Sequence, residues 1–461
     1  MNIYDHFRNE SLYPDLDVDG ACSRLSAAVR LKTVSDCEDP APFLELHELM
    51  KSSFPHIMAA GGFETVGRSV LIRVPGSDSS LRPALFMSHQ DVVPVVKGTE
   101  DDWIHGAYSG DIEDGIIWGR GTQDIKEQVF AELEAAEYLL SRGLKNARTI
   151  YFAFGEDEET FNRGSKALSD LLFSRGERLE FVLDEGGGGI QSGELLGAPG
   201  LSVMPIDLME KGYADLKLSV KSTGGHSSRP WGGTSLGRLA RAIDRIVSAP
   251  FPAELCSTFK QSLRTVAPYI KDPKLAELLS DVDANAELIA ASFMESKDLF
   301  PFVTTTIAPT MISGSSDAPN VMPQNMEAVI NFRIAAGHTP EAVMEHCRKA
   351  VDDDSVSMEF LQANPASAEA RFDGFGYAQL IKALDSFYGD VVFVPFMSVG
   401  ATDAHNYEQI CDTCLRCSPF VSTEEEEKGV HGTNERISVR SYAQGIRVLI
   451  SLMKESCGFA R

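Results

Sequence analysis

The strongest constraint on the fold is an alternation of apolar runs and amphipathic stretches in the N-terminal part of the chain. Four apolar runs have the length of buried strands: Ser69–Val74, Ala84–Ser88, Thr149–Phe154 and Leu179–Leu183. Helical periodicity appears at Ile125–Leu140 and at Ser165–Phe173, and each of these stretches ends shortly before a glycine. This alternation predicts an α/β domain in which helices flank a mostly parallel sheet.

A different pattern begins near residue 208. Strand-like and helix-like segments follow in the order β-α-β-β-α-β, which is the order of a ferredoxin-like α+β unit. The segments are Ala214–Lys221, Ser235–Val247, Thr304–Ile312, Glu327–Ile334, Pro340–Val351 and Val356–Leu361. A mostly helical stretch at about 252–298 interrupts the order and enlarges the unit.

The first pattern resumes after this unit, with a helix at Gly376–Tyr388 and a strand at Val391–Pro395. A chain of 461 residues is also too long for one ordinary core. We therefore expect a discontinuous α/β domain formed by residues 1–207 and 365–461. Residues 208–364 are expected to form an inserted domain.

Composition narrows the classes of partner. The formal net charge is −25, which argues against nucleic acid and anionic membranes as partners. No run of about 18 apolar residues occurs, and the first residues lack the apolar core of a secretory signal. Eight cysteines in a chain of this length are sparse, which favours a reducing environment. These features predict a cytoplasmic protein.

Three of the cysteines, Cys411, Cys414 and Cys417, have the spacing C-x2-C-x2-C. Such spacing can mark a zinc or iron–sulfur site, but a structural site needs a complete ligand set. No fourth ligand of the expected type stands nearby, and LRCSPFV around Cys417 has the pattern of a strand. A structural role for these cysteines is therefore the favoured interpretation.

Groups that can bind metal follow three of the predicted strands directly. Ala84–Ser88 leads into His89 and Asp91, Thr149–Phe154 into the acidic quartet 156–159, and Leu179–Leu183 into Asp184 and Glu185. Each feature alone has an ordinary explanation as a loop histidine, a helix cap or a solvated charge run. Ligands of parallel sheets bind beyond the carboxyl ends of the strands, so we expect these groups to converge on one crevice.

Two further segments supply groups of the same kind. The glycine-rich turn 119–124 delivers Asp124 to the start of a predicted helix, and His431 lies in a polar loop near the C-terminus. Their ordinary roles would be a helix N-cap and a loop histidine. Imidazoles and carboxylates without thiolate suit Zn²⁺, with Co²⁺ or Mn²⁺ as substitutes. The number of candidate ligands exceeds the needs of one tetrahedral ion and fits a pair of ions better.

These motifs resemble the dinuclear-zinc metallopeptidase family that includes carboxypeptidase S, glutamate carboxypeptidase, aminoacylase, succinyl-diaminopimelate desuccinylase and carnosinase. The matching segments are SHQDVVPV (88–95), WGRGTQDIK (118–126), GEDEET (155–160), LDEGGG (183–188), GGHSSRP (224–230), APNVMPQNMEAVINFRI (318–334), GATDAH (400–405) and HGTNE (431–435). They occur in the family's order and span nearly the whole chain. The resemblance implies that residues 1–207 and 365–461 form the catalytic, metal-binding domain and that residues 208–364 form a lid or dimerisation domain. The EDEE sequence, the chain length and the helical stretch make the carboxypeptidase-S-like branch the most similar.

The resemblance implies a role for each matched residue. The implied zinc ligands are His89, Asp124 as the bridging carboxylate, Glu159, Asp184 and His431. The implied catalytic residues are Glu158 as general base, Asp91 as the group that orients His89, and His226 as the group that polarises the scissile carbonyl. The implied substrate-binding residues are Asn320 and Arg333 at the substrate carboxylate, with Gly400 and Thr402 in a nearby loop.

The implied activity is metal-dependent hydrolysis of dipeptides or N-acyl amino acids that carry a free C-terminal carboxylate. A hydroxide that bridges two Zn²⁺ ions would attack the amide, with Glu158 as the base. The alternatives are N-acyl-amino-acid deacylase or desuccinylase activity, and a catalytically silent metal-binding protein on the same fold. His226 can act within its chain or across a homodimer formed through the inserted domain.

The chain departs from the resemblance in three places, one in the segment after Trp103 and two near implied site residues. Ile125 follows Asp124 where several dipeptide-cleaving relatives carry a second Asp or an Asn, and Glu156 opens the quartet where many carboxypeptidase-S-like relatives have His. None of these departures removes an implied ligand. The preferred substrate side chain and the role of Glu156 stay open.

Overall fold

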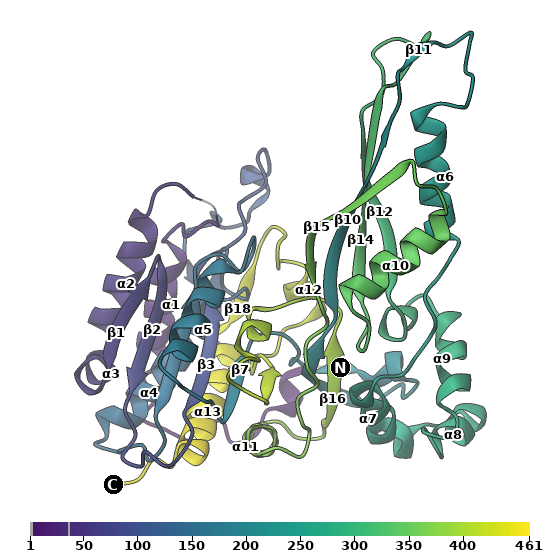
Figure 1. The fold of residues 1–461 in the computed structure, drawn as a ribbon. Coiled ribbons are helices and arrows are strands. Elements are labelled where there is room, and N and C mark those ends of the chain that lie inside the picture. Colours follow the sequence, from purple (N-terminus) through teal and green to yellow (C-terminus); the bar gives the residue numbers. More distant parts are fainter. Residues whose placement is uncertain (1–2, 36) are drawn as a thin grey trace.

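The structure, a computed structural model, describes residues 3–35 and 37–461. Its largest sheet has nine strands, and the central four, β6, β3, β7 and β17, are parallel (Figure 1). The path across the sheet is β1 (Gly62–Val66), β2 (Ser69–Val74), β6 (Ile150–Gly155), β3 (Ala84–His89), β7 (Phe181–Asp184), β17 (Cys414–Arg416), β9 (Ser202–Glu210) and β16 (Val392–Ser398), with β8 (Gln191–Ser192) paired to β9. The predicted α/β class is confirmed.

Helices cover both faces of this sheet because successive side chains of its strands point to opposite sides. In β6, Phe152 and Phe154 join the core with α1 (Val18–Val29), α4 (Lys126–Ser141), α11 (Phe375–Phe387) and α13 (Val439–Ser456). Tyr151 and Ala153 face α5 (Arg163–Ser174) and the 3-10 helix η6 (Asp403–Tyr407). The chain also has helices α2 (Ala41–Ser53) and α3 (Pro55–Ala60), which sequence patterns did not reveal.

The segment between β9 and β16 builds a second, four-stranded sheet. Its order is β12 (Thr306–Ser313), β14 (Asn325–Ile334), β10 (Gly212–Lys221) and β15 (Val356–Asn364), and all neighbours are antiparallel. Helices α6 (Ser235–Val247) and α10 (Pro340–Val351) share its core. Order and topology match the predicted ferredoxin-like unit. The predicted division after residue 207 falls within β9, which stays in the large sheet until Glu210.

The helical stretch packs differently from the expectation. Its helices are α7 (Ser257–Val266), α8 (Pro273–Leu279) and α9 (Ala286–Met294). Their apolar residues, such as Phe259 and Ile289, form a core with Val394 and Met397 of β16. The core of the four-stranded sheet, by contrast, contains no residue of α7, α8 or α9. The stretch therefore covers the edge strand β16 of the large sheet. Helices that cover an edge strand protect it from pairing with another chain.

Short elements complete the fold. β4 (Ile112–Glu113), β5 (Ile116–Trp118) and β18 (Arg436–Ser438) form a small sheet, and β11 (Gly225–His226) pairs with β13 (Val321–Met322). One turn of helix, α12 (Glu424–Glu427), follows Thr423. Across the described residues, none of the helices combines the length and apolar character needed to cross a membrane.

The three closely spaced cysteines are buried in two different cores. Cys411 and Cys414 lie in the core beside α5, and Cys417 lies in the core on the other face of the large sheet. Among the described residues, neither group of side chains that could hold a metal includes a cysteine. The structural interpretation of this motif stays a prediction, which the burial of the three cysteines in apolar cores supports.

Candidate metal centre and substrate cleft

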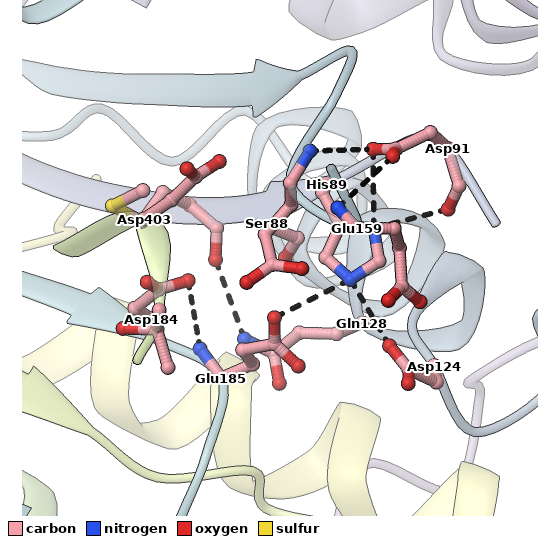
Figure 2. Close-up of polar contacts among 12 residues, drawn as sticks. Ser88, His89, Asp91, Asp124, Gln128, Glu159, Asp184, Glu185 and Asp403 are labelled. Atoms are coloured by element: carbon pink, nitrogen blue, oxygen red, sulfur yellow. Dashed lines mark hydrogen bonds and ion pairs between the residues drawn. The ribbon is translucent and has the colours of Figure 1, made fainter. Parts of the chain in front are cut away.

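The ends of three neighbouring parallel strands form the floor of the candidate site. β6, β3 and β7 lie side by side in the large sheet and end at Gly155, His89 and Asp184. The residues at and just after these ends come together, as expected for the carboxyl edge of a parallel sheet (Figure 2). Two sets of possible ligands share His89: one adds Glu158 and Glu185, and the other adds Asp124 and Glu159.

Asp124 lies between the two histidines of the site. Its Oδ1 is 3.0 Å from His89 Nε2, and its Oδ2 is 2.9 Å from His431 Nε2. His431 Nε2 also lies 3.1 Å from Glu159 Oε2. One carboxylate thus offers a different oxygen to each histidine, which is the arrangement that a bridging ligand requires. The helix that follows begins after Ile125, so the N-cap interpretation of Asp124 is wrong.

Glu185, rather than Asp184, faces His89. Glu185 Oε1 is 3.3 Å from His89 Nε2, while Asp184 Oδ1 accepts a hydrogen bond from the backbone N–H of Glu185 at 2.9 Å. Asp184 is the last residue of β7, and adjacent residues at a strand end point to opposite sides. The resemblance implied Asp184 as the ligand, whereas Glu185 is the residue that approaches His89. Which of two adjacent acids faces the site depends on the exact strand terminus.

Asp91 supports the site from behind. Its carboxylate lies 3.4 Å from His89 Nδ1 and accepts hydrogen bonds from the backbone N–H groups of Glu158 and Glu159, each at 3.2 Å. Ser35 Oγ donates to it at 2.6 Å. Asp91 is fully buried, so it fixes both the imidazole and the turn that carries the acidic quartet.

The acidic quartet divides into two pairs. Glu156 points away from the metal groups and forms an ion pair with Arg68, Nε to Oε2 at 2.7 Å. Asp157 accepts a hydrogen bond from the backbone of Gly164 at 2.7 Å, at the start of α5. Glu158 and Glu159 face the site. Glu156 therefore has a structural partner, which answers the question that the sequence left open.

The turn before Asp124 is held by Glu435, a residue of the HGTNE motif to which no role was assigned. Glu435 Oε1 accepts the backbone N–H groups of Gly121 and Gln123, each at 2.9 Å. Its Oε2 accepts from Arg120 Nη1 at 2.5 Å. Both side chains of this ion pair are almost completely buried. Glu435 thus joins the C-terminal loop of His431 to the turn that carries Asp124.

Burial and neighbouring charges strongly shift the pKa values of the site residues. Burial raises the pKa of Glu158 well above its ordinary value, although the nearby His89 charge opposes this effect. Burial likewise raises the pKa of Glu185 to about 7. Hydrogen bonds to Asp124 and Glu159 raise the pKa of His431 to about 10. A buried cluster with this excess of carboxylates calls for compensating cations.

A cleft of about 460 Å³ opens beside these groups. Its wall includes Arg333 of β14 and Tyr213 of β10, whose ring lies 4.9 Å from the guanidinium carbon. Within residues 3–35 and 37–461, no carboxylate forms an ion pair with Arg333. Gly400 and Thr402 also line the cleft, but Thr402 donates its backbone N–H and its hydroxyl to buried Glu210, at 3.0 and 3.1 Å.

Two expected residues lie elsewhere. His226 belongs to β11, at the far end of the four-stranded sheet in Figure 1, and Asn320 accepts a hydrogen bond there from the backbone of Ser227 at 2.9 Å. Both are exposed, and neither lines the cleft. The chain alone therefore does not bring His226 and Asn320 to the metal groups.

Comparison with known proteins agrees with this arrangement. Residues 85–455 match the model of peptidase family M20/M25/M40. The chain is 30% identical to probable carboxypeptidase S-like 2 of Dictyostelium discoideum, over 98% of this chain and 87% of that protein. It is 32% identical to human N-fatty-acyl-amino acid synthase/hydrolase PM20D1, over 94% of this chain and 87% of that protein.

A solved structure shows the same fold. The M20 family metallo-carboxypeptidase Sso-CP2 of Sulfolobus solfataricus superimposes with a TM-score of 0.69 at 17% identity. The match covers 95% of this chain and 99% of that one. Fold, motifs and the long family match agree: the chain belongs to peptidase family M20/M25/M40.

Proposed function

We propose that this protein is a metal-dependent amide hydrolase that cleaves dipeptides or N-acyl amino acids with a free C-terminal carboxylate. The observation that carries this proposal is one cleft shared by the metal-ligand cluster and Arg333, which has no ion-pair partner among the described residues. A carboxylate bound at Arg333 would place a nearby amide bond at the ligand cluster. The relationship to the PM20D1 and carboxypeptidase S-like proteins supports the same substrate classes.

The ligand cluster fits two divalent cations. All of its donors are imidazole nitrogens and carboxylate oxygens, which suit Zn²⁺ and, as substitutes, Co²⁺ or Mn²⁺. Asp124 would bridge both ions, with His89 on one side and His431 and Glu159 on the other. For the remaining ligand beside His89 we favour Glu185 over the predicted Asp184, because only Glu185 approaches His89. Asp184 would then support the Glu185 backbone.

Glu158 is the proposed general base. When bound, the metal ions would supply Lewis-acid activation of water and of the scissile carbonyl. The Glu158 carboxylate would take a proton from the attacking water and later donate it to the leaving amine. Glu158 lines the cleft and lies with His89 and Glu185 in a possible ligand group, which puts its carboxylate beside the proposed metal ions.

Arg333 is the proposed clamp for the substrate carboxylate. Its planar guanidinium can bind a carboxylate through two parallel hydrogen bonds, and stacking on Tyr213 limits its freedom. The loop with Gly400 and Thr402 lines the same part of the cleft, and its bonds to Glu210 hold it in place.

His226 and Asn320 would complete the site of a second subunit. Both stand at the exposed tip of the inserted unit, far from the cleft of their own chain. A homodimer formed through this unit could deliver them to the partner's cleft, where His226 would donate a hydrogen bond to the developing oxyanion. We also propose a cytoplasmic location, which the eight unpaired cysteines support.

A hydrolysis screen tests the proposal. The zinc-loaded protein is assayed with dipeptides, N-acetyl amino acids, long-chain N-acyl amino acids and an N-succinyl amino acid, and a chelated sample serves as the control. We expect metal-dependent release of the C-terminal amino acid from at least one of these classes. Metal binding without hydrolysis of any class would instead support a catalytically silent protein.

A further inference from the structure

A second cavity, of about 220 Å³, adjoins the substrate cleft. The two spaces share only Asp124 and Glu185 among their lining residues, so they meet at the metal-ligand carboxylates. Arg333 lines the first cleft and not the second cavity. A substrate with its carboxylate at Arg333 and its amide at the ligand cluster therefore has the second cavity available for its acyl side.

All the charged side chains that line this cavity are acidic, among the described residues. Glu127 and Glu427 line it together with the shared Asp124 and Glu185, and no Lys, Arg or His does so among the described residues. The remaining wall includes apolar side chains of Ile125, Phe420, Val421, Val430 and Ile437. Such a space offers no basic partner to an anionic acyl group, and it accommodates an apolar side chain beside a cation.

Glu127 is the unusual member of this lining. It stands in the first turn of α4, three residues after Asp124, and is only 2% exposed. Its Oε2 has no hydrogen-bond partner among the described residues. A buried carboxyl oxygen without a partner is costly, so its presence beside a cavity needs an explanation. A cation in the cavity would supply the missing partner.

We propose that this cavity binds the N-terminal residue of a dipeptide and that Glu127 binds its free α-ammonium group. The inference rests on the proposed function and deepens it by naming the substrate class. The α-ammonium is attached one carbon away from the scissile carbonyl, which places it next to the metal-ligand carboxylates. The apolar wall then takes an aliphatic or aromatic side chain of the same residue.

An unsubstituted acyl chain fits this cavity less well. Hydrocarbon against Glu127 would leave the Glu127 carboxyl oxygen without a partner after water is expelled. A succinyl group would bring its carboxylate near Glu127 and Glu427, which bind no metal ion in the proposed site, and no basic side chain among the described residues lines the cavity to receive it. Dipeptides with an apolar N-terminal residue are therefore preferred over both classes.

The test compares two substrates that differ in one group. The first is a dipeptide with N-terminal leucine, and the second is its analogue in which the α-amino group is replaced by hydrogen. We expect the zinc-loaded protein to cleave the dipeptide with a kcat/KM at least about tenfold higher, as for a lost charge-assisted hydrogen bond. Glu127→Gln should lower the dipeptide preference about tenfold, mainly through KM, with metal content unchanged.

Glu132→Gln is the matched control. Glu132 lies on the same helix, is fully buried and also has a carboxyl oxygen without a partner, but it does not line the cavity. This variant should keep the substrate ratio of the parent protein. Equal cleavage of both substrates by the parent protein, or an equal effect of both variants on the ratio, would overturn the inference. Cleavage of neither substrate, with hydrolysis of another class in the screen, would also overturn the inference. Absence of hydrolysis of every class would overturn the hydrolase proposal itself.

Discussion

His89 and His431 contact different oxygens of one carboxylate. The Nε2 atoms of these histidines lie 3.0 and 2.9 Å from Asp124 Oδ1 and Oδ2, respectively. The first histidine ends a central strand, and the second comes from a C-terminal loop that Glu435 connects to the Asp124 turn. This relationship supports a two-ion site centred on Asp124 and leads to the following predictions.

Glu158→Gln should keep the metal but lose activity. The amide is similar in shape to the carboxylate but cannot accept the proton of the attacking water, so we expect kcat to fall at least about a hundredfold. Steady-state kinetics and metal analysis of the same preparation check this prediction. Near-normal kcat in a metal-loaded variant would remove Glu158 from the role of base.

Arg333→Ala should impair substrates selectively. Loss of the guanidinium removes the partner of a substrate carboxylate, so kcat/KM for a free-carboxylate substrate should drop about a hundredfold or more. The corresponding C-terminal amide should be affected far less. Arg348→Ala, at an exposed position of α10, serves as the control. A similar loss on both substrates would contradict the clamp.

Glu435→Gln should weaken metal binding without removing a ligand. The neutral amide leaves Arg120 buried without its ion-pair partner and loosens the turn that carries Asp124. We expect metal affinity to fall about 10- to 100-fold, as for other groups that orient ligands. Glu134→Gln breaks another ion pair, with the partly buried Arg24, away from the metal groups, and so controls for general destabilisation. Equal metal affinities for both variants would argue against a positioning role.

Mixed dimers test whether His226 acts across subunits. His226→Ala and Glu158→Gln should each be nearly inactive as pure proteins. If each cleft uses its own Glu158 and the partner's His226, half of the randomly mixed dimers regain one intact site, about a quarter of normal activity. If His226 acts within its own chain, mixing restores no activity. Gel filtration of both variants must first show that they form the same oligomer as the parent protein.

The sequence predicted most of the groups that the structure brings together, because these groups follow strand ends. His89, Glu158 and Glu159 stand next to apolar runs, and the ends of parallel strands lie together in space. The ferredoxin-like unit was equally visible, because its strands and helices have distinct periodicities. These features depend on local pattern and on simple rules of topology.

Other features depend on geometry that local pattern does not encode. The orientation of Glu185 toward His89 follows from where β7 ends, and a difference of one residue reverses the side chain. Helix α7 packs against β16 through contacts between Phe259 and Phe396, which are far apart in the chain. The distance of His226 from the cleft likewise follows from the length of the strands that carry it.

The most direct test of the central claim is the metal content and metal position of the protein. Zinc-loaded protein should contain two ions per chain by elemental analysis, and anomalous diffraction should place one ion on each side of Asp124. Asp124→Asn should reduce binding of both ions, since each would lose the shared ligand. A single ion, or ions bound away from Asp124, would contradict the account.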